Sequence, residues 1–226
     1  MKSLQESLLD DEDILMDKSD MHIQVKKWLE DNSYDLKIKN YKINNDNTID
    51  CDSVDVWHRG DFEEFPVYIK FNKVGNFHID GVQHLKSTRG FPIICDKIFI
   101  KEAYFLEKID IPTEKINDAL IIVDCPALEE IRTKTKSVDL LRLWNLPKLE
   151  NLEHITKSVR SVELHSLSKI KSLKGLPNKI NVLEIMHCRN LTSLDGCPKH
   201  INGLFAKFGV NDEFIDKLKD INNIKD

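Results

Sequence analysis

Histidine and cysteine are the residues of this sequence whose types could support acid–base, nucleophilic or metal chemistry. The chain has eight histidines and five cysteines. His154, His165, His187 and His200 recur in its second half, but no carboxylate or cysteine stands beside them at a repeated ligand spacing. No H-E-x-x-H motif, G-x-S-x-G motif or glycine-rich phosphate loop is present in the sequence. We therefore expect no catalytic residue, no metal site and no cofactor.

A sequence repeat determines the structural positions of these residues. Three successive segments of 21 residues begin at Val138, Val159 and Ile180, and apolar residues occupy the same slots in each. The register extends backward, and a leading apolar residue recurs at positions 77, 98, 120, 141, 162, 183 and 204. A fixed period of about 20 to 29 residues with an L-x-x-L-x-L core is typical of a leucine-rich-repeat solenoid.

The L-x-L element of each repeat has the two-residue period of a strand, so both apolar side chains point inward. Stacked repeats would place these strands side by side in a parallel sheet on one face of the solenoid. The other apolar slots, spaced by three, favour turns or 3₁₀ pieces on the opposite face. We expect strands near 97–101, 119–123, 140–144, 161–165, 182–186 and 203–207.

The cysteines fit this register better than they fit a ligand set. Their number is odd and no C-x-x-C pair occurs, which argues against a disulfide framework or a zinc site. Cys125, Cys188 and Cys197 fill slots that hold Leu or Ile in other repeats. We expect these three to be buried free thiols.

The segment Ile180–Leu194 resembles the cysteine-slot leucine-rich repeats of plant immune receptors. The 21-residue length and the endings Gly175–Pro177 and Gly196–Pro198 resemble short leucine-rich-repeat proteins of bacteria and phages. The resemblance covers roughly residues 54–207 and implies binding of other proteins through the sheet face. One departure is that the slot usually filled by Asn or Cys is apolar in four repeats, which removes an asparagine ladder: Val82, Ala103, Leu146 and Leu167.

The outward slots of the expected sheet form the candidate partner-binding site. Apolar side chains occupy several of them where a solvated sheet face would be polar. Trp and Arg at the centre of such a patch are typical of an interface hot spot. The alternative is that a terminal segment covers this face. The candidate residues are Phe99, Ile121, Val123, Leu140, Arg142, Trp144, Glu163, His165, Glu184 and Met186.

The two ends of the chain look like caps. Residues 1–53 are expected to form a helical and β-hairpin cap, 54–207 the solenoid and 208–226 a helical cap. In the first, Ser3 with Glu6 is a weak capping box, and Ser19 or Asp20 is a candidate N-cap for a second helix. That helix would bury Met21, Val25, Trp28 and Leu29, and a hairpin turn is expected at Asn44–Asn47; at the other end Asn211 precedes a stripe of Phe214, Leu218 and Ile221.

Composition limits the function classes. The 226 residues are 41% hydrophobic, enough for a core, but no apolar run is long enough to span a membrane and no signal sequence is evident. We therefore expect a cytoplasmic protein. Residues 1–32 hold nine acids and four bases, whereas the rest holds 29 of each. The repeats thus lack a net basic excess, which disfavours nucleic acid as partner but leaves a local basic patch open.

These observations favour a non-enzymatic protein-binding module, a bacterial or phage adaptor or inhibitor that recognises a partner protein through the sheet face. Two alternatives stay open. One is a structural component of a larger assembly such as a phage or envelope complex, with self-association. The other is an enzyme with a site on the sheet face. The acidic N-terminal arm is a candidate second docking element or a cover for the open end of the solenoid.

Overall fold

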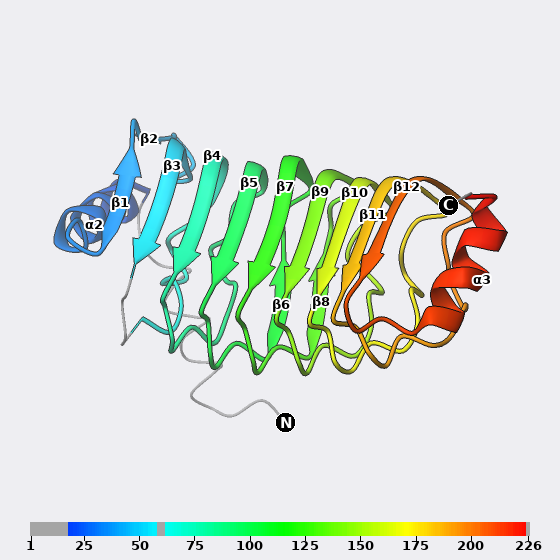
Figure 1. The fold of residues 1–226 in the computed structure, drawn as a ribbon. Coiled ribbons are helices and arrows are strands. Elements are labelled where there is room, and N and C mark those ends of the chain that lie inside the picture. Colours follow the sequence, from blue (N-terminus) through cyan, green and yellow to red (C-terminus); the bar gives the residue numbers. More distant parts are fainter. Residues whose placement is uncertain (1–17, 58–61, 225–226) are drawn as a thin grey trace, which may run out of the picture.

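A computed structural model describes residues 18–57 and 62–224 of the chain. The expected capping box at Ser3 and Glu6 lies outside these residues. The described chain forms a parallel β-solenoid of about seven turns of about 21 residues, with a helix at each end. Figure 1 shows the strands of its large sheet in one row, with α2 (Lys18–Asp31) beyond one end and α3 (Asp212–Asn222) beyond the other. The arrows from β3 to β12 in this sheet are parallel, and β1 runs the opposite way.

The large sheet has ten strands in the order β1-β3-β4-β5-β7-β9-β10-β11-β12, and β2 pairs with β3. A second sheet pairs β6 with β8. The helices are α2 (Lys18–Asp31) and α3 (Asp212–Asn222). The strands are β1 (Leu36–Lys39), β2 (Lys42–Ile43), β3 (Ile49–Trp57), β4 (Phe71–Asp80), β5 (Ile94–Lys101), β6 (Lys108–Ile111), β7 (Lys115–Val123), β8 (Glu130–Thr133), β9 (Ser137–Trp144), β10 (Ser158–His165), β11 (Lys179–Met186) and β12 (His200–Lys207).

The expected parallel strands are confirmed, and equivalent residues of neighbouring repeats pair directly. Val162 lies opposite Leu141 on one side and Leu183 on the other, and all three are fully buried. Each of the six expected strands, now β5, β7, β9, β10, β11 and β12, begins three or four residues before the expected start. A further buried residue, such as Val138 or Val159, causes this extension by entering the core three positions before the leading apolar residue. The two-residue period is broken there, which hid the extension from the sequence pattern.

A left-handed corner follows each large-sheet strand from β4 to β12, a feature that the apolar pattern did not predict. The seven corner residues have φ between 45° and 68°, and the first six donate their backbone N–H to a carbonyl of the next coil. Only one of them is the glycine that such a φ favours. This backbone ladder stands beside the buried apolar slots Val82, Ala103, Leu146 and Leu167 and holds the corner without an asparagine ladder. The corner residues are Gly81, Glu102, Asp124, Asn145, Ser166, His187 and Phe208.

The side opposite the large sheet, here called the return side, is built from turns and short extended pieces. The parallel pair β6 and β8 lies on it, behind the large sheet in Figure 1, and Ser172 and Ser193 form an isolated parallel bridge. The expectation of turns is confirmed, but residues 18–57 and 62–224 contain no 3₁₀ helix. Four consecutive residues can pair here because Ile109 and Ile131 are buried in matching positions of consecutive coils.

The N-terminal cap combines a helix with the expected hairpin. Val25 and Leu29 of α2 are buried, and Trp28 packs on Phe65 with ring centroids 6.0 Å apart. Ser19 and Asp20 are already inside α2, so neither is its N-cap. The hairpin is confirmed, since β2 pairs antiparallel with β3 around Asn44–Asn47. Because β3 runs on into the parallel sheet, the cap and the solenoid share a strand across the expected boundary after residue 53.

The C-terminal cap begins where the sequence indicated. Asn211 is the N-cap of α3, and its side-chain Oδ1 accepts a hydrogen bond from the Phe214 N–H at 2.9 Å. Phe214 and Leu218 are buried against the last coil, but Ile221 is 42% exposed and therefore does not belong to the buried stripe. Asn222 fixes the helix to the solenoid, because its Oδ1 accepts from the Ile201 N–H and its Nδ2 donates to the Pro198 carbonyl.

All five cysteines are buried free thiols, which confirms the expectation for Cys125, Cys188 and Cys197. Burial raises the pKa of Cys125 to about 12 and that of Cys197 to about 11, because desolvation disfavours the thiolate. Burial also raises the pKa of Cys188. Its Sγ lies 3.4 Å from the Met186 carbonyl and 3.6 Å from the Leu164 carbonyl, so the thiol bridges the corner of its coil.

These thiols should react slowly in the folded protein. At about pH 8 a maleimide or disulfide reagent should label Cys125, Cys188 and Cys197 at least about a hundredfold more slowly than in unfolded protein, because both access and thiolate are scarce. The measurement is mass spectrometry of the labelled peptides over time, with urea-unfolded protein as the reference. Native labelling of these three at the unfolded rate would contradict their burial.

Gly175 provides a test of how tightly the coils stack. Its φ is +104°, and an added Cβ would lie 2.4 Å from the Leu152 carbonyl carbon. Gly175→Ala should therefore lower the free energy of unfolding by at least about 2 kcal/mol. Gly203→Ala is the matched control, because the nearest atom to its added Cβ is at 3.5 Å and its φ is ordinary. Urea unfolding of both variants is the measurement, and equal midpoints would contradict the close packing of these coils.

Candidate functional site

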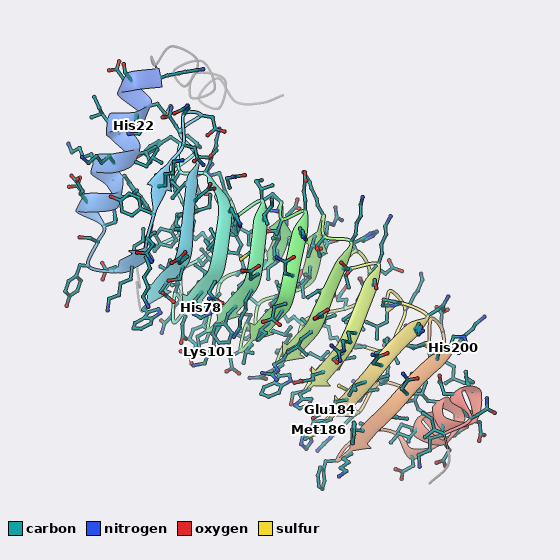
Figure 2. The ribbon with its side chains drawn as sticks, turned by 90° about the horizontal axis from the view of Figure 1, so that it is seen from above. His22, His78, Lys101, Glu184, Met186 and His200 are labelled. Carbon is teal, nitrogen blue, oxygen red and sulfur yellow. The ribbon has the colours of Figure 1, made fainter. Side chains whose placement is uncertain are left out.

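The outward side chains of the large sheet form a continuous face across the middle of the solenoid. The described helices lie at the two ends of the row of strands, so neither covers this face (Figure 1). The alternative of a covering terminal segment does not hold for any described residue. Figure 2 shows His78, Lys101, Glu184 and Met186 along the edge where the strands end, and His200 at the opposite edge.

Register brings the candidate residues into three rows that cross the strands. The row through Trp144 contains Val123, His165 and Met186, and the row through Arg142 contains Ile121, Glu163 and Glu184. Leu140 lies in the third row. Phe99 extends the row through Arg142 toward the N-terminus. Because neighbouring strands lie about 4.8 Å apart, adjacent members of one row are in contact distance. The structure therefore brings together the residues that the pattern selected.

Trp144 lies at the centre of this patch between two charged or polar side chains. Its ring stacks on His165 with centroids 4.6 Å apart and an interplanar angle of 6°. The Arg142 guanidinium carbon lies 4.6 Å from the ring centroid, a cation–π distance. Its indole Nε1 is buried and has no hydrogen-bond partner among the described residues. The sequence predicted that Trp144 lies outside the core. The structure adds that Arg142 and His165 contact its ring and fix its position.

Two carboxylates fix the neighbours of Trp144. Arg142 donates Nε–H to Glu163 Oε2 at 2.6 Å and Nη2–H to Glu163 Oε1 at 3.0 Å. The hydrogen bonds from Arg142 to the Glu163 carboxylate raise the pKa of the guanidinium, which stays charged. His165 Nε2 lies 2.9 Å from Glu184 Oε1. A bidentate pair and an imidazole–carboxylate pair thus hold both ring contacts in one geometry.

The apolar candidates are less exposed than the pattern implied. Ile121 is only 5% exposed, so the expectation that it contributes exposed surface is wrong. Phe99 and Arg142 stand on either side of it in the same row and cover it. Val123 and Leu140 are half-buried. Periodicity assigns a side chain to a face, but the size of its neighbours decides how much of it a partner reaches.

The sheet face also holds a polar group that the selection of apolar outward slots missed. His78 Nδ1 lies 3.0 Å from Asp55 Oδ1, and the His78 ring meets Phe99 edge-on at 5.5 Å. Lys101 pairs with Asp80 at 3.6 Å and with Glu102 at 3.0 Å. The sequence signal for these pairs was an acidic and a basic side chain about one repeat apart. The pairs extend the network of side-chain contacts on this face toward β3.

Two histidines of the described chain pair with carboxylates on the sheet face. His78 and His165 each pair with a carboxylate, but no hydroxyl or thiol within the described chain hydrogen-bonds to either imidazole. No group of three potential metal ligands is found in the part of the chain that the structure describes. No described helix is long and apolar enough to cross a membrane.

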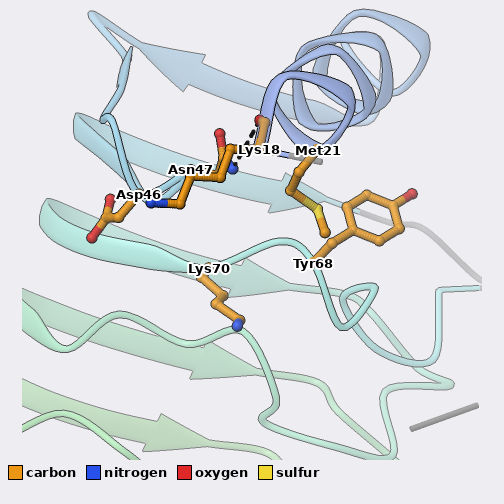
Figure 3. Close-up of a pocket in the computed structure, with 6 residues that line it drawn as sticks. All are labelled: Lys18, Met21, Asp46, Asn47, Tyr68 and Lys70. Carbon is orange, nitrogen blue, oxygen red and sulfur yellow. Dashed lines mark hydrogen bonds between the residues drawn. The ribbon is translucent and has the colours of Figure 1, made fainter. Parts of the chain in front are cut away.

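Four pockets among the described residues are lined by none of Arg142, Trp144 and His165. One of about 250 Å³ opens between α2, the hairpin and the segment before β4, and is lined by Lys18, Met21, Asp46, Asn47, Tyr68 and Lys70 (Figure 3). Its only bond between the drawn residues runs from Asn47 Nδ2 to the Lys18 carbonyl at 3.3 Å. This pocket lies between the cap and the solenoid, and the polar side chains that line it do not point toward one position.

The Arg142–Glu163 pair should contribute measurably to stability. Arg142→Gln, Glu163→Gln and the double variant should give a coupling energy of about 1 kcal/mol in a double-mutant cycle, because the pair is bidentate and mostly covered. Lys169–Glu150 is the matched control pair: it joins neighbouring coils, but its side chains are 49% and 61% exposed, and a coupling below about 0.3 kcal/mol is expected. Equal coupling in the two cycles, from urea unfolding, would contradict the ordered network.

Comparisons with known proteins identify no relative of this chain. No family model, no curated protein and no solved structure matches this chain.

Proposed function

We propose that this chain is a non-enzymatic protein-binding module, an adaptor or inhibitor that recognises a partner protein through the sheet face. The observation that carries the proposal is the fixed stack of Arg142, Trp144 and His165 at the centre of that face. Trp and Arg contribute a disproportionate share of the binding energy at interfaces. Side chains that are ordered before binding lose less conformational entropy when a partner docks.

The chemistry around the stack suits a protein surface. Val123, Leu140 and Met186 supply half-buried apolar area, while Glu163 and Glu184 supply acceptors beside it. An apolar centre with polar groups around it is the usual anatomy of a protein interface. The surface is the broad outward face of a sheet, and a face of this shape favours a macromolecular partner over a small molecule.

Relationship to the short leucine-rich-repeat proteins is part of the same proposal. The pattern of Ile180–Leu194 supports it, and so does Cys188, whose thiol bridges backbone carbonyls at the corner where such repeats place a polar ladder. A cytoplasmic location belongs to the proposal as well, and five unpaired thiols in the folded chain support it.

A structural role in an assembly is the second candidate, and the last coil favours it. Leu204 occupies a core slot yet stays only partly buried, because no further coil stacks on β12. Phe205 and Phe208 beside it are 52% and 70% exposed. If the protein acts by self-association, this end is the natural contact, and light scattering across a concentration series distinguishes an assembling chain from a monomeric binder.

The proposal is tested by changing Trp144. The wild-type chain is used to capture its partner from the source cell, and the purified partner is then titrated against wild type and Trp144→Ala. The substitution should weaken binding by at least roughly thirtyfold, since a hot-spot residue contributes about 2 kcal/mol or more. Trp57→Ala is the control, because that Trp is 49% exposed and lies on β3, away from the Trp144 patch.

The stability of the same variants completes the test. Trp144→Ala removes the ring contacts to Arg142 and His165, and Trp144 is not part of the buried core cluster, so its urea midpoint should stay close to that of the wild type. Unchanged partner affinity in the folded Trp144→Ala variant would overturn the proposal that this face is the binding surface.

A further inference from the structure

A second site lies at the opposite edge of the sheet, where β9 and β10 begin, the upper edge in Figure 1. A pocket of about 510 Å³ opens there. Three lysines, one histidine, three threonines and a glycine line it, and no carboxylate is among them: Thr133, Lys134, Thr135, Lys136, His154, Thr156, Lys157 and Gly175. The repeats as a whole carry no basic excess, so this is a local concentration of positive charge.

The lysines gather because of the repeat register. Ser137 pairs with Ser158, so Lys136 and Lys157, which precede them, stand in equivalent positions on adjacent coils. Elsewhere on the molecule, charged residues one coil apart form opposite pairs, as in Lys174–Glu153 and Lys86–Glu63. None of Lys134, Lys136 and Lys157 has an ion pair within the described residues. Like charges held together without a counterion favour an anion between them.

Glu153 and Glu114, which lie next to the pocket along the chain or by register, form no ion pair with its lysines. Glu153 is engaged by Lys174 at 2.8 Å, and the hydrogen bond from Lys174 lowers the pKa of its carboxyl. Glu114 precedes β7 as Lys136 precedes β9, but it does not line the pocket and forms no ion pair with Lys136. The positive charge of the three lysines is therefore available to a ligand.

The backbone that carries the lysines is fixed before any ligand arrives. Thr135 Oγ1 accepts from the Ile116 N–H at 3.3 Å and donates to the Ser137 carbonyl at 3.1 Å. Thr133 Oγ1 donates to the Ile155 carbonyl, and Thr156 Oγ1 donates to the Ser158 carbonyl at 2.9 Å. These bonds hold the two corners on which Lys134, Lys136 and Lys157 stand.

The remaining wall leaves room for a ligand. Gly175 contributes no side chain, and its φ of +104° is one that other residues rarely adopt. His154 also has a left-handed backbone, with φ of +65°, and its exposed imidazole adds a hydrogen-bond donor beside the lysines. Lysine ammonium groups bind phosphate as point charges from several directions, which suits three flexible side chains around one cavity.

We propose that this pocket binds a phosphate-class oxyanion, as free phosphate or as the phosphate group of a small ester. The proposal is independent of the sheet face, because the pocket lies at the strand starts and Trp144 at a strand end. The repeat places Lys136 and Lys157 in equivalent positions on adjacent coils, and Lys134 adds a third positive charge to the pocket. A small anion with more than one negative charge fits the site better than chloride, since it meets all three ammonium groups at once.

The test is an NMR titration of the full chain at about 0.15 M NaCl, which screens diffuse surface attraction. Inorganic phosphate, pyrophosphate and phenyl phosphate are added separately, and amide shifts are followed to about 20 mM ligand. Saturable shifts at residues 133–136 and 154–157 are expected. Tighter binding of phenyl phosphate than of inorganic phosphate identifies the ester as the source, and the reverse identifies the free ion.

Variants separate this site from general electrostatics. Lys136→Gln and Lys157→Gln should each weaken pyrophosphate binding by at least about fivefold, while Lys136→Arg should retain it. Lys148→Gln is the matched control, since that exposed lysine follows β9 at its other end and should leave the affinity unchanged. Linear shifts without saturation, or equal weakening by Lys148→Gln, would overturn the proposal. All these lysines are exposed, and unchanged spectra away from the pocket confirm folding.

Discussion

Stacking of equivalent residues at a repeat of about 21 residues is the constraint on which the rest of the molecule depends. Each coil closes its own core only by placing residues such as Leu141, Val162 and Leu183 directly above one another. One inserted residue would move every following side chain to the wrong side of its strand. The solenoid absorbs the 22-residue spacing between Ile98 and Leu120 with a register shift after Cys95, and the pairing of β3 with β4 contains a second shift after Ile49. The left-handed corners keep that register at the end of each strand.

The same register produces both candidate sites. On the sheet face it sets Arg142 beside Glu163 and Trp144 beside His165, so that opposite charges pair and rings stack. At the strand starts it sets Lys136 beside Lys157, so that like charges accumulate. A repeat therefore turns the choice of residue in one slot into a row of neighbours about 4.8 Å apart. A binding surface in such a molecule therefore consists of rows of equivalent residues on neighbouring coils.

Periodicity predicted the parallel sheet, its outward residues and the burial of Cys125, Cys188 and Cys197, because these depend only on which slots are apolar. It did not predict the corners at Glu102, Ser166 and Phe208, since these residue types do not favour a positive φ and only the closed coil imposes it. The pairing of β6 with β8 and the burial of Ile121 were missed for a related reason. Both depend on the size and position of neighbours on other coils, which a one-dimensional pattern does not contain.

The claim that the sheet face is the recognition surface is tested most directly by site-specific photo-crosslinking in the source cell. A photoreactive residue replaces Met186 on the sheet face or, in the control, Lys171 next to the Ser172–Ser193 bridge on the return side. The account predicts one dominant protein adduct from position 186, competed by unmodified wild-type chain, and none from position 171. Adducts that form only from position 171, or from neither position although a partner co-purifies, would contradict it.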